Sequence, residues 1–147
     1  MNKRIFSILS LILILSCLLA MPALAFAEPE VPEDPVEPDE PYVDISYYNC
    51  GCSIDSSSGL TYCSSYAQTA HTSNTIYINI SLQRYKDGYW QQYAGPWYNS
   101  GTGYCTSYKY YYVVPGYYYR TYSGVAVYDS NGNFIESSYL YSPGRYY

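Results

Sequence analysis

The sequence predicts an all-β domain of antiparallel strands in two packed sheets, a β-sandwich. Within residues 75–85, aliphatic side chains occupy every second position from Ile76 to Leu82, so they share one face of a strand. Asp-Gly and Asn-Gly pairs stand between such alternating runs and are typical of tight hairpins. No stretch of the domain shows helical periodicity.

Turn-forming residues separate the predicted strands. Asp87-Gly88 closes one hairpin, and the run from Asp129 to Gly132 closes a second. A further break is expected at residues 99–101. About seven short strands in a domain of this length fit an aligned sandwich. They are expected near residues 43–54, 60–69, 75–85, 89–98, 103–114, 117–129 and 133–142.

The chain begins with a predicted signal peptide over residues 1–27. Two basic residues precede an apolar run, and small residues precede the expected cut between Ala27 and Glu28. The protein is therefore expected to be secreted, with attachment to the cell envelope left open. The membrane is expected as a partner only through this signal peptide. Lipidation of Cys17 is a weaker alternative, because it would leave an apolar stretch behind the anchor without a polar spacer.

Charge separates a linker from the domain. Residues 28–41 hold seven acids, five prolines and no base, whereas residues 42–147 hold five acids and five bases. Such a composition predicts a disordered, extended tether ahead of a neutral domain. A domain without a basic stripe is not expected to bind nucleic acid.

The domain contains four cysteines: Cys50, Cys52, Cys63 and Cys105. In an exported chain they predict disulfides rather than a metal site, and Cys-x-Cys lacks the spacing of a zinc knuckle. A Cys50–Cys52 bridge would be strained. Cys63 is therefore expected to pair with either Cys52 or Cys105, and no metal or cofactor is expected.

A short motif predicts a structural corner. Val113, Pro115, Gly116 and Tyr119 match the turn that enters the penultimate strand of immunoglobulin-like and fibronectin type III-like sandwiches. We expect the ring of Tyr119 to pack at this corner and its hydroxyl to donate a hydrogen bond to the upstream backbone.

From about residue 61 to residue 142, the chain carries in order Cys63, Ile76 to Leu82 with Gln83-Arg84, Trp90, Gly116 with Tyr119-Arg120, Val127-Tyr128-Asp129, Gly132 and Glu136. This order is similar to a family of small exported proteins of Gram-positive, Firmicutes-type bacteria. The resemblance implies a leader, an immunoglobulin-like or fibronectin type III-like domain and no assigned activity. The tyrosine density and Cys50-Gly51-Cys52 depart from that family's pattern.

Few residues are candidates for catalysis. His71 is the only histidine, and it lies in a polar stretch with no acid within ten residues, so we expect a solvated side chain. The run from Asp129 begins like a calcium loop, but Phe134 stands where glycine is required and Leu140 where a carboxylate is required. An enzyme is therefore not expected.

Tyrosine is abundant, with 24 residues, and it fills every position of 110–112 and of 117–119, odd and even alike. Because alternate strand positions face opposite sides, some of these rings must be exposed. The sequence predicts a non-catalytic module that binds an extracellular glycan or protein, as a monomer or with weak self-association. A membrane-active, bacteriocin-like antagonist and a self-associating surface protein are the alternatives. The expected contact residues are Trp97, Tyr98, Tyr110, Tyr112 and Tyr118.

Overall fold

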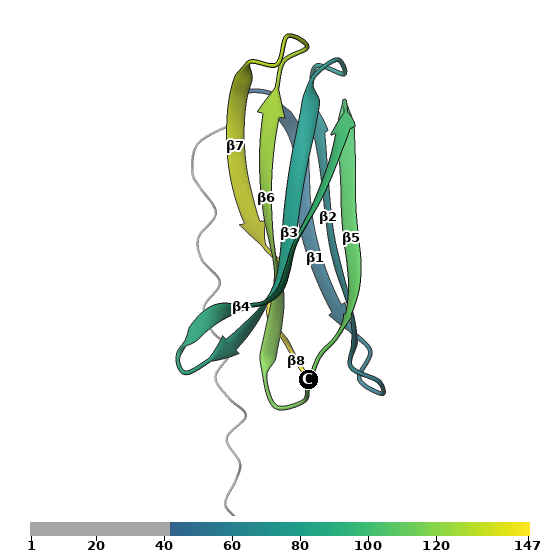
Figure 1. Ribbon diagram of the computed structural model, residues 1–147, viewed down its shortest axis with the longest axis vertical. Coiled ribbons are helices and arrows are strands. Elements are labelled where there is room, and N and C mark those ends of the chain that lie inside the picture. The colour runs from purple at the N-terminus through teal and green to yellow at the C-terminus, as the bar shows by residue number, and fades with distance from the viewer. Residues whose placement is uncertain (1–41) are drawn as a thin grey trace, which may run out of the picture. The chain divides into compact units, whose positions relative to one another are not determined.

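The computed structural model describes residues 42–147. The predicted signal peptide, Cys17 and the acidic linker lie outside these residues. Residues 42–147 form an all-β arrangement of two facing antiparallel sheets, with no helix (Figure 1). The strands are β1 (Ile45–Ile54), β2 (Leu60–Thr69), β3 (Thr75–Lys86), β4 (Tyr89–Thr102), β5 (Tyr104–Tyr112), β6 (Tyr118–Tyr128), β7 (Phe134–Tyr141) and β8 (Arg145–Tyr146).

The strands divide into a three-stranded sheet, β1-β2-β5, and a five-stranded sheet, β4-β3-β6-β7 with β8 paired to β6. All registered strand pairs are antiparallel. The chain crosses between sheets after β2, β4 and β5, so that β3 and β6 become the central strands of the larger sheet. The predicted all-β, sandwich-like architecture and its seven main strands are confirmed, and β8 is a short addition.

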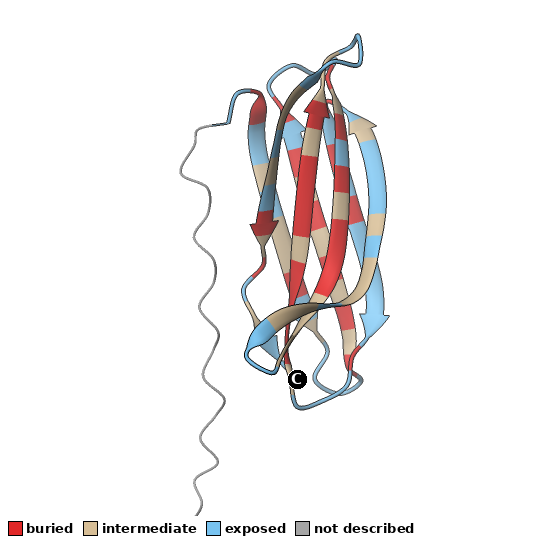
Figure 2. Ribbon diagram, turned by 60° about the vertical axis from the view of Figure 1, so that its left-hand side comes forward, coloured by how far each residue is buried: buried red, intermediate tan, exposed pale blue. Residues whose placement is uncertain are grey.

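Alternation of side chains forms the core between the sheets. On β3 the aliphatic side chains of the predicted face, Ile76 to Leu82, are buried. Figure 2 shows buried segments alternating with exposed ones along the outer strands. The central strand β6 is buried at most positions on both faces. Each fully buried aliphatic side chain contributes about 1.5 to 3 kcal/mol through the hydrophobic effect.

The turns explain where the strands end. Asp87 and Gly88 both have positive φ, 57° and 89°, as the predicted two-residue hairpin requires. The break expected at residues 99–101 is wrong, because β4 continues to Thr102 and the chain turns at Gly103, where φ is 75°. A Cβ on Gly101 would overlap the carbonyl oxygen of Tyr104, so this corner requires glycine at position 101.

Candidate functional site

A hollow lies on the outer face of the five-stranded sheet. Its floor and two of its walls form one row across four strands, set by the register of the ladders. Tyr98 on β4 lies opposite Asn79 on β3, Asn79 lies opposite Gly124 on β6, and Gly124 lies opposite Tyr139 on β7. Two large rings therefore stand at the ends of a row whose middle positions are small.

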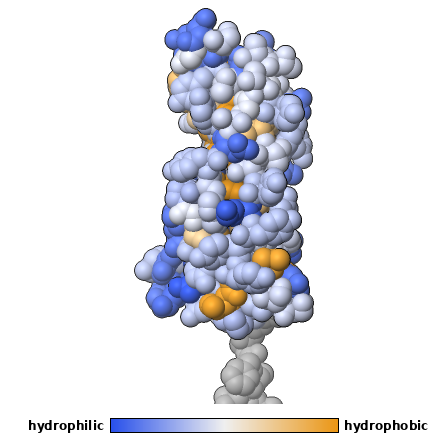
Figure 3. All heavy atoms as spheres, turned by 45° about the vertical axis from the view of Figure 1, so that its right-hand side comes forward, coloured by the Kyte–Doolittle hydropathy of each residue, from blue (hydrophilic) through white to orange (hydrophobic). Residues whose placement is uncertain are grey.

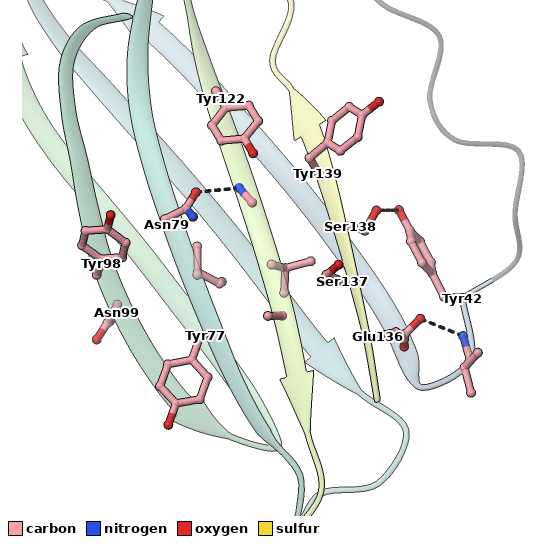
Figure 4. A pocket seen from close by; sticks show the side chains of 15 residues that line it. Tyr42, Tyr77, Asn79, Tyr98, Asn99, Tyr122, Glu136, Ser137, Ser138 and Tyr139 are labelled. Carbon is pink, nitrogen blue, oxygen red and sulfur yellow. Dashed lines mark hydrogen bonds between the residues drawn. The ribbon is translucent and has the colours of Figure 1, made fainter. Parts of the chain in front are cut away.

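The neighbouring rows close the hollow. Tyr77 lies opposite Ala126 on one side of this row, and Tyr122 lies opposite Ser81 on the other. We call this hollow, of about 730 Å³, the tyrosine groove (Figure 4). Its walls are Tyr77, Tyr98, Tyr122 and Tyr139, and its floor is Asn79, Gly124 and Ala126.

Contacts between rings hold three of the four walls in place. The ring of Tyr77 meets the ring of Tyr128 edge-on, with centroids 5.5 Å apart. The ring of Tyr122 stacks on Tyr139 at 6.5 Å, and Tyr139 meets Tyr141 at 5.7 Å. Such pairs restrain the orientation of the rings. Tyr98 is the most accessible wall, with 74% of its surface exposed.

The floor presents neutral hydrogen-bonding groups. The Oδ1 atom of Asn79 accepts a hydrogen bond from the backbone N–H of Gly124 at 3.2 Å, which fixes the amide and leaves Nδ2 on its other side (Figure 4). The hydroxyl of Tyr122 lies 3.1 Å from the point a Cβ on Gly124 would occupy. Burial, and then the neighbours Tyr141 and Tyr139, raise the pKa of Tyr122, so its hydroxyl is a neutral donor.

The charged side chain at the rim is already engaged. Glu136 lines the groove, and its carboxylate accepts hydrogen bonds from the backbone N–H groups of Val43, Asp44 and Ile45 at 2.9, 2.6 and 2.6 Å. The other groove residues that the structure describes are uncharged. The groove is therefore aromatic, neutral and lined with amide and hydroxyl groups.

A second concentration of tyrosine lies on the other sheet. The outward positions of β1, β2 and β5 carry seven tyrosines, and the closest ring pair among them is Tyr62 and Tyr110, 5.0 Å between centroids. Figure 3 shows a mostly hydrophilic surface with apolar residues confined to small patches and a central seam. We call this surface the tyrosine face: Tyr47, Tyr62, Tyr66, Tyr104, Tyr108, Tyr110 and Tyr112.

The five contact residues expected from the sequence do not share one surface. Tyr98 lies in the groove, and Tyr110 and Tyr112 lie on the tyrosine face. Trp97 is half-buried against the core, because its position on β4 lies opposite the inward Ile80. Tyr118 is buried, because β8 covers the start of β6, and it is not a contact residue.

The structural corner has the geometry expected of it. Tyr119 is fully buried, and its hydroxyl donates a hydrogen bond to the carbonyl oxygen of Val114 at 2.8 Å. Val113 is buried beside it, and Pro115 precedes Gly116, whose φ is 95°. This corner holds the start of β6, the strand that carries the wall residue Tyr122 and the floor residues Gly124 and Ala126.

The predicted disulfide is not formed, and Cys50, Cys52, Cys63 and Cys105 are all free thiols. The register places Cys52 directly opposite Cys63, whereas Cys105 lies opposite Ala67. Of the two partners expected for Cys63, Cys52 is therefore the neighbour. Burial raises the pKa of Cys50 to about 12, so this thiol is protonated at neutral pH.

His71 has a partner that the sequence did not predict. Its Nδ1 atom lies 2.5 Å from Oδ1 of Asp44, and Asn74 donates to the other oxygen of the same carboxylate at 2.8 Å. The start of β1 and the β2–β3 loop meet at one end of the sandwich, which brings together residues 27 positions apart. Within residues 42–147, no three His, Cys, Asp or Glu side chains gather closely enough to hold a metal ion.

The fold and the groove define a two-sheet, all-β domain with a neutral, tyrosine-lined hollow on one sheet. Comparisons with protein-family models, with curated proteins and with solved structures found no match. The part of the chain that the structure describes contains no helix long and apolar enough to cross a membrane.

Proposed function

We propose that this protein is an exported, non-catalytic module that binds a neutral glycan in the tyrosine groove. The observation that carries the proposal is the combination of four tyrosine walls, an amide in the floor, hydroxyl groups in the lining and no unpaired charge. Tyrosine rings can pack against the apolar faces of sugars, while neutral donors and acceptors match sugar hydroxyls. A charged ligand would find no counter-charge in this lining.

The size of the groove supports a ligand of small-molecule or oligosaccharide dimensions. Its volume of about 730 Å³ lies within the range of roughly 300 to 1,000 Å³ of ligand pockets. Tyr98 and Tyr139 are separated by three strand spacings, or about 14 Å. That width accommodates a few sugar rings rather than a protein domain.

We further propose that the scaffold is immunoglobulin-like or, more narrowly, fibronectin type III-like. The corner at Tyr119 supports this assignment, because its hydroxyl bonds back to the upstream backbone in the way such sandwiches use. The chain's crossings between a three-stranded and a larger sheet are also consistent with it. Membership of the exported Gram-positive family stays a prediction.

Self-association is a second candidate function, favoured by the tyrosine face. Its outward positions carry no charged side chain, so two copies could stack there without like-charge repulsion. Size measurement of the protein across a concentration series tests this alternative. A mass that rises with concentration would favour it.

Retention of the protein on immobilised glycans tests the first proposal, and the chain supplies matched variants. Gly124→Ala adds a methyl group 2.8 Å from Oδ1 of Asn79 and 3.1 Å from the Tyr122 hydroxyl. Gly51→Ala adds the same group 2.9 Å from Oγ of Ser64, on the other sheet. The added methyl group would meet only side-chain atoms at both positions, and neither glycine has positive φ, so both variants should fold.

We expect Gly124→Ala to lose glycan retention at least roughly tenfold, which corresponds to about 1.4 kcal/mol. Gly51→Ala should bind as the unmodified protein does. Thermal unfolding of both variants checks that each is folded. The proposal fails if the protein is retained on no glycan of a broad panel, or if a folded Gly124→Ala variant binds normally.

A further inference from the structure

We propose that the acidic, proline-rich segment of residues 28–41 binds in the tyrosine groove of its own chain. The sequence places Pro29, Pro32, Pro35, Pro38 and Pro41 at every third position. A polyproline II helix has three residues per turn. In that conformation all five rings lie on one side, and the seven acids lie on the other two.

The segment joins the domain at the rim of the groove. Pro41 directly precedes Tyr42, and both Tyr42 and Val43 line the groove. The carboxylate of Glu136 accepts a hydrogen bond from the N–H of Val43 at 2.9 Å, and the hydroxyl oxygens of Tyr42 and Ser138 are 3.4 Å apart (Figure 4). The point at which the segment leaves the domain is therefore fixed on the β7 side of the groove.

The segment is long enough to cross the groove. One turn of polyproline II advances about 9 Å, so Pro35 to Pro41 spans about 19 Å. The groove is about 14 Å wide between Tyr139 and Tyr98. Grooves lined by aromatic side chains are the usual receptors for polyproline II segments. With the prolines against the rings, the acids face water and need no partner in the neutral groove.

Attachment favours the chain's own segment over one from a second molecule. A short tether gives an effective concentration on the order of millimolar. An intrinsically weak contact is then enough to occupy the groove for a substantial fraction of the time. The segment would compete with any ligand of the groove, so this inference does not depend on that ligand being a glycan.

Nuclear magnetic resonance of the full chain with labelled proline tests the inference. Proline ring protons that lie over tyrosine rings should shift upfield from the positions they have in a free peptide of residues 28–41. Tyr98→Ala, which removes the most exposed wall, should return them to the free positions. The shifts should persist at high salt, because ring packing rather than charge holds the segment.

Two multiple substitutions within the segment form a matched pair. Replacing Pro32, Pro35 and Pro38 by alanine removes rings and retains all seven acids, whereas replacing Val31 and Val36 by alanine retains every proline. The proline variant should abolish the remaining upfield shifts, because it removes the rings that pack on the tyrosines. The valine variant should leave the shifts unchanged.

Proline signals at free-peptide positions in the unmodified chain would overturn the inference. Upfield shifts that vanish on dilution would also overturn it, because they would assign the groove to a segment from another copy. Loss of the shifts in high salt would show that charge holds the segment. The measurement requires no glycan, so its result and that of the glycan screen are independent.

Discussion

Removal of one hydroxyl group, in Tyr119→Phe, tests the corner that positions β6. The ring of Tyr119 is fully buried and meets the ring of Tyr93 edge-on, with centroids 5.4 Å apart. The substitution retains that packing and removes the hydroxyl, with its 2.8 Å hydrogen bond to Val114 and its interaction with Arg84. A net hydrogen bond of this kind contributes about 1 kcal/mol to the free energy of unfolding.

For a domain of this size, a loss of 1 kcal/mol lowers Tm by about 4 to 8 °C. Urea unfolding followed by tryptophan fluorescence should show a lower midpoint at an unchanged slope. Tyr110→Phe is the control, because Tyr110 is exposed and its change should stay within about 0.5 kcal/mol. Equal stability of Tyr119→Phe and the unmodified protein, or an equal loss in Tyr110→Phe, would refute the role of the corner.

Three further predictions concern buried or engaged polar groups. Burial alone would raise the pKa of Asp44, but its hydrogen bonds lower the pKa below the ordinary value of 3.8. The Asp44 carboxylate should therefore stabilise the folded protein above pH 3.8, and this stabilisation should be lost as the pH falls through the folded-state pKa. Asp44→Asn should remove this acid dependence in pH-jump unfolding curves. Oxidised glutathione should form a disulfide between Cys52 and Cys63, with a mass loss of about 2 Da and a gain of about 3 kcal/mol in the free energy of unfolding. The Cys105→Ser variant should still form this disulfide, whereas Cys63→Ser should not. Glu136→Ala should lower the free energy of unfolding by about 1 to 3 kcal/mol, because three backbone donors lose their acceptor. Amide hydrogen exchange should accelerate first at residues 43–45.

The strands and hairpins could be predicted because their signals are local. The alternation from Ile76 to Leu82 and the Asp87-Gly88 pair each lie within a few residues, and the structure confirms both. The corner motif around Tyr119 is equally local. Such features depend on neighbouring residues and need no knowledge of which strands pair.

The groove could not be predicted because it depends on register between strands distant in sequence. Nothing near Asn79 indicates that Gly124 will lie beside it, or that tyrosines from β4 and β7 will end the same row. The same limit explains why Trp97 was expected outside. A useful signal was present: Asn79 and Gly124 are small or polar residues at outward positions of strands rich in tyrosine.

The three backbone hydrogen bonds that the Glu136 carboxylate accepts form a clamp, which gives the domain a mechanical property. A pulling force applied through residue 41 reaches the carboxylate and its three backbone donors before it reaches the ladder between β1 and β2. While the clamp holds, tension stays off this edge strand. Once it breaks, Tyr42 and Val43 leave the rim of the groove, so tension would open the groove before the domain unfolds.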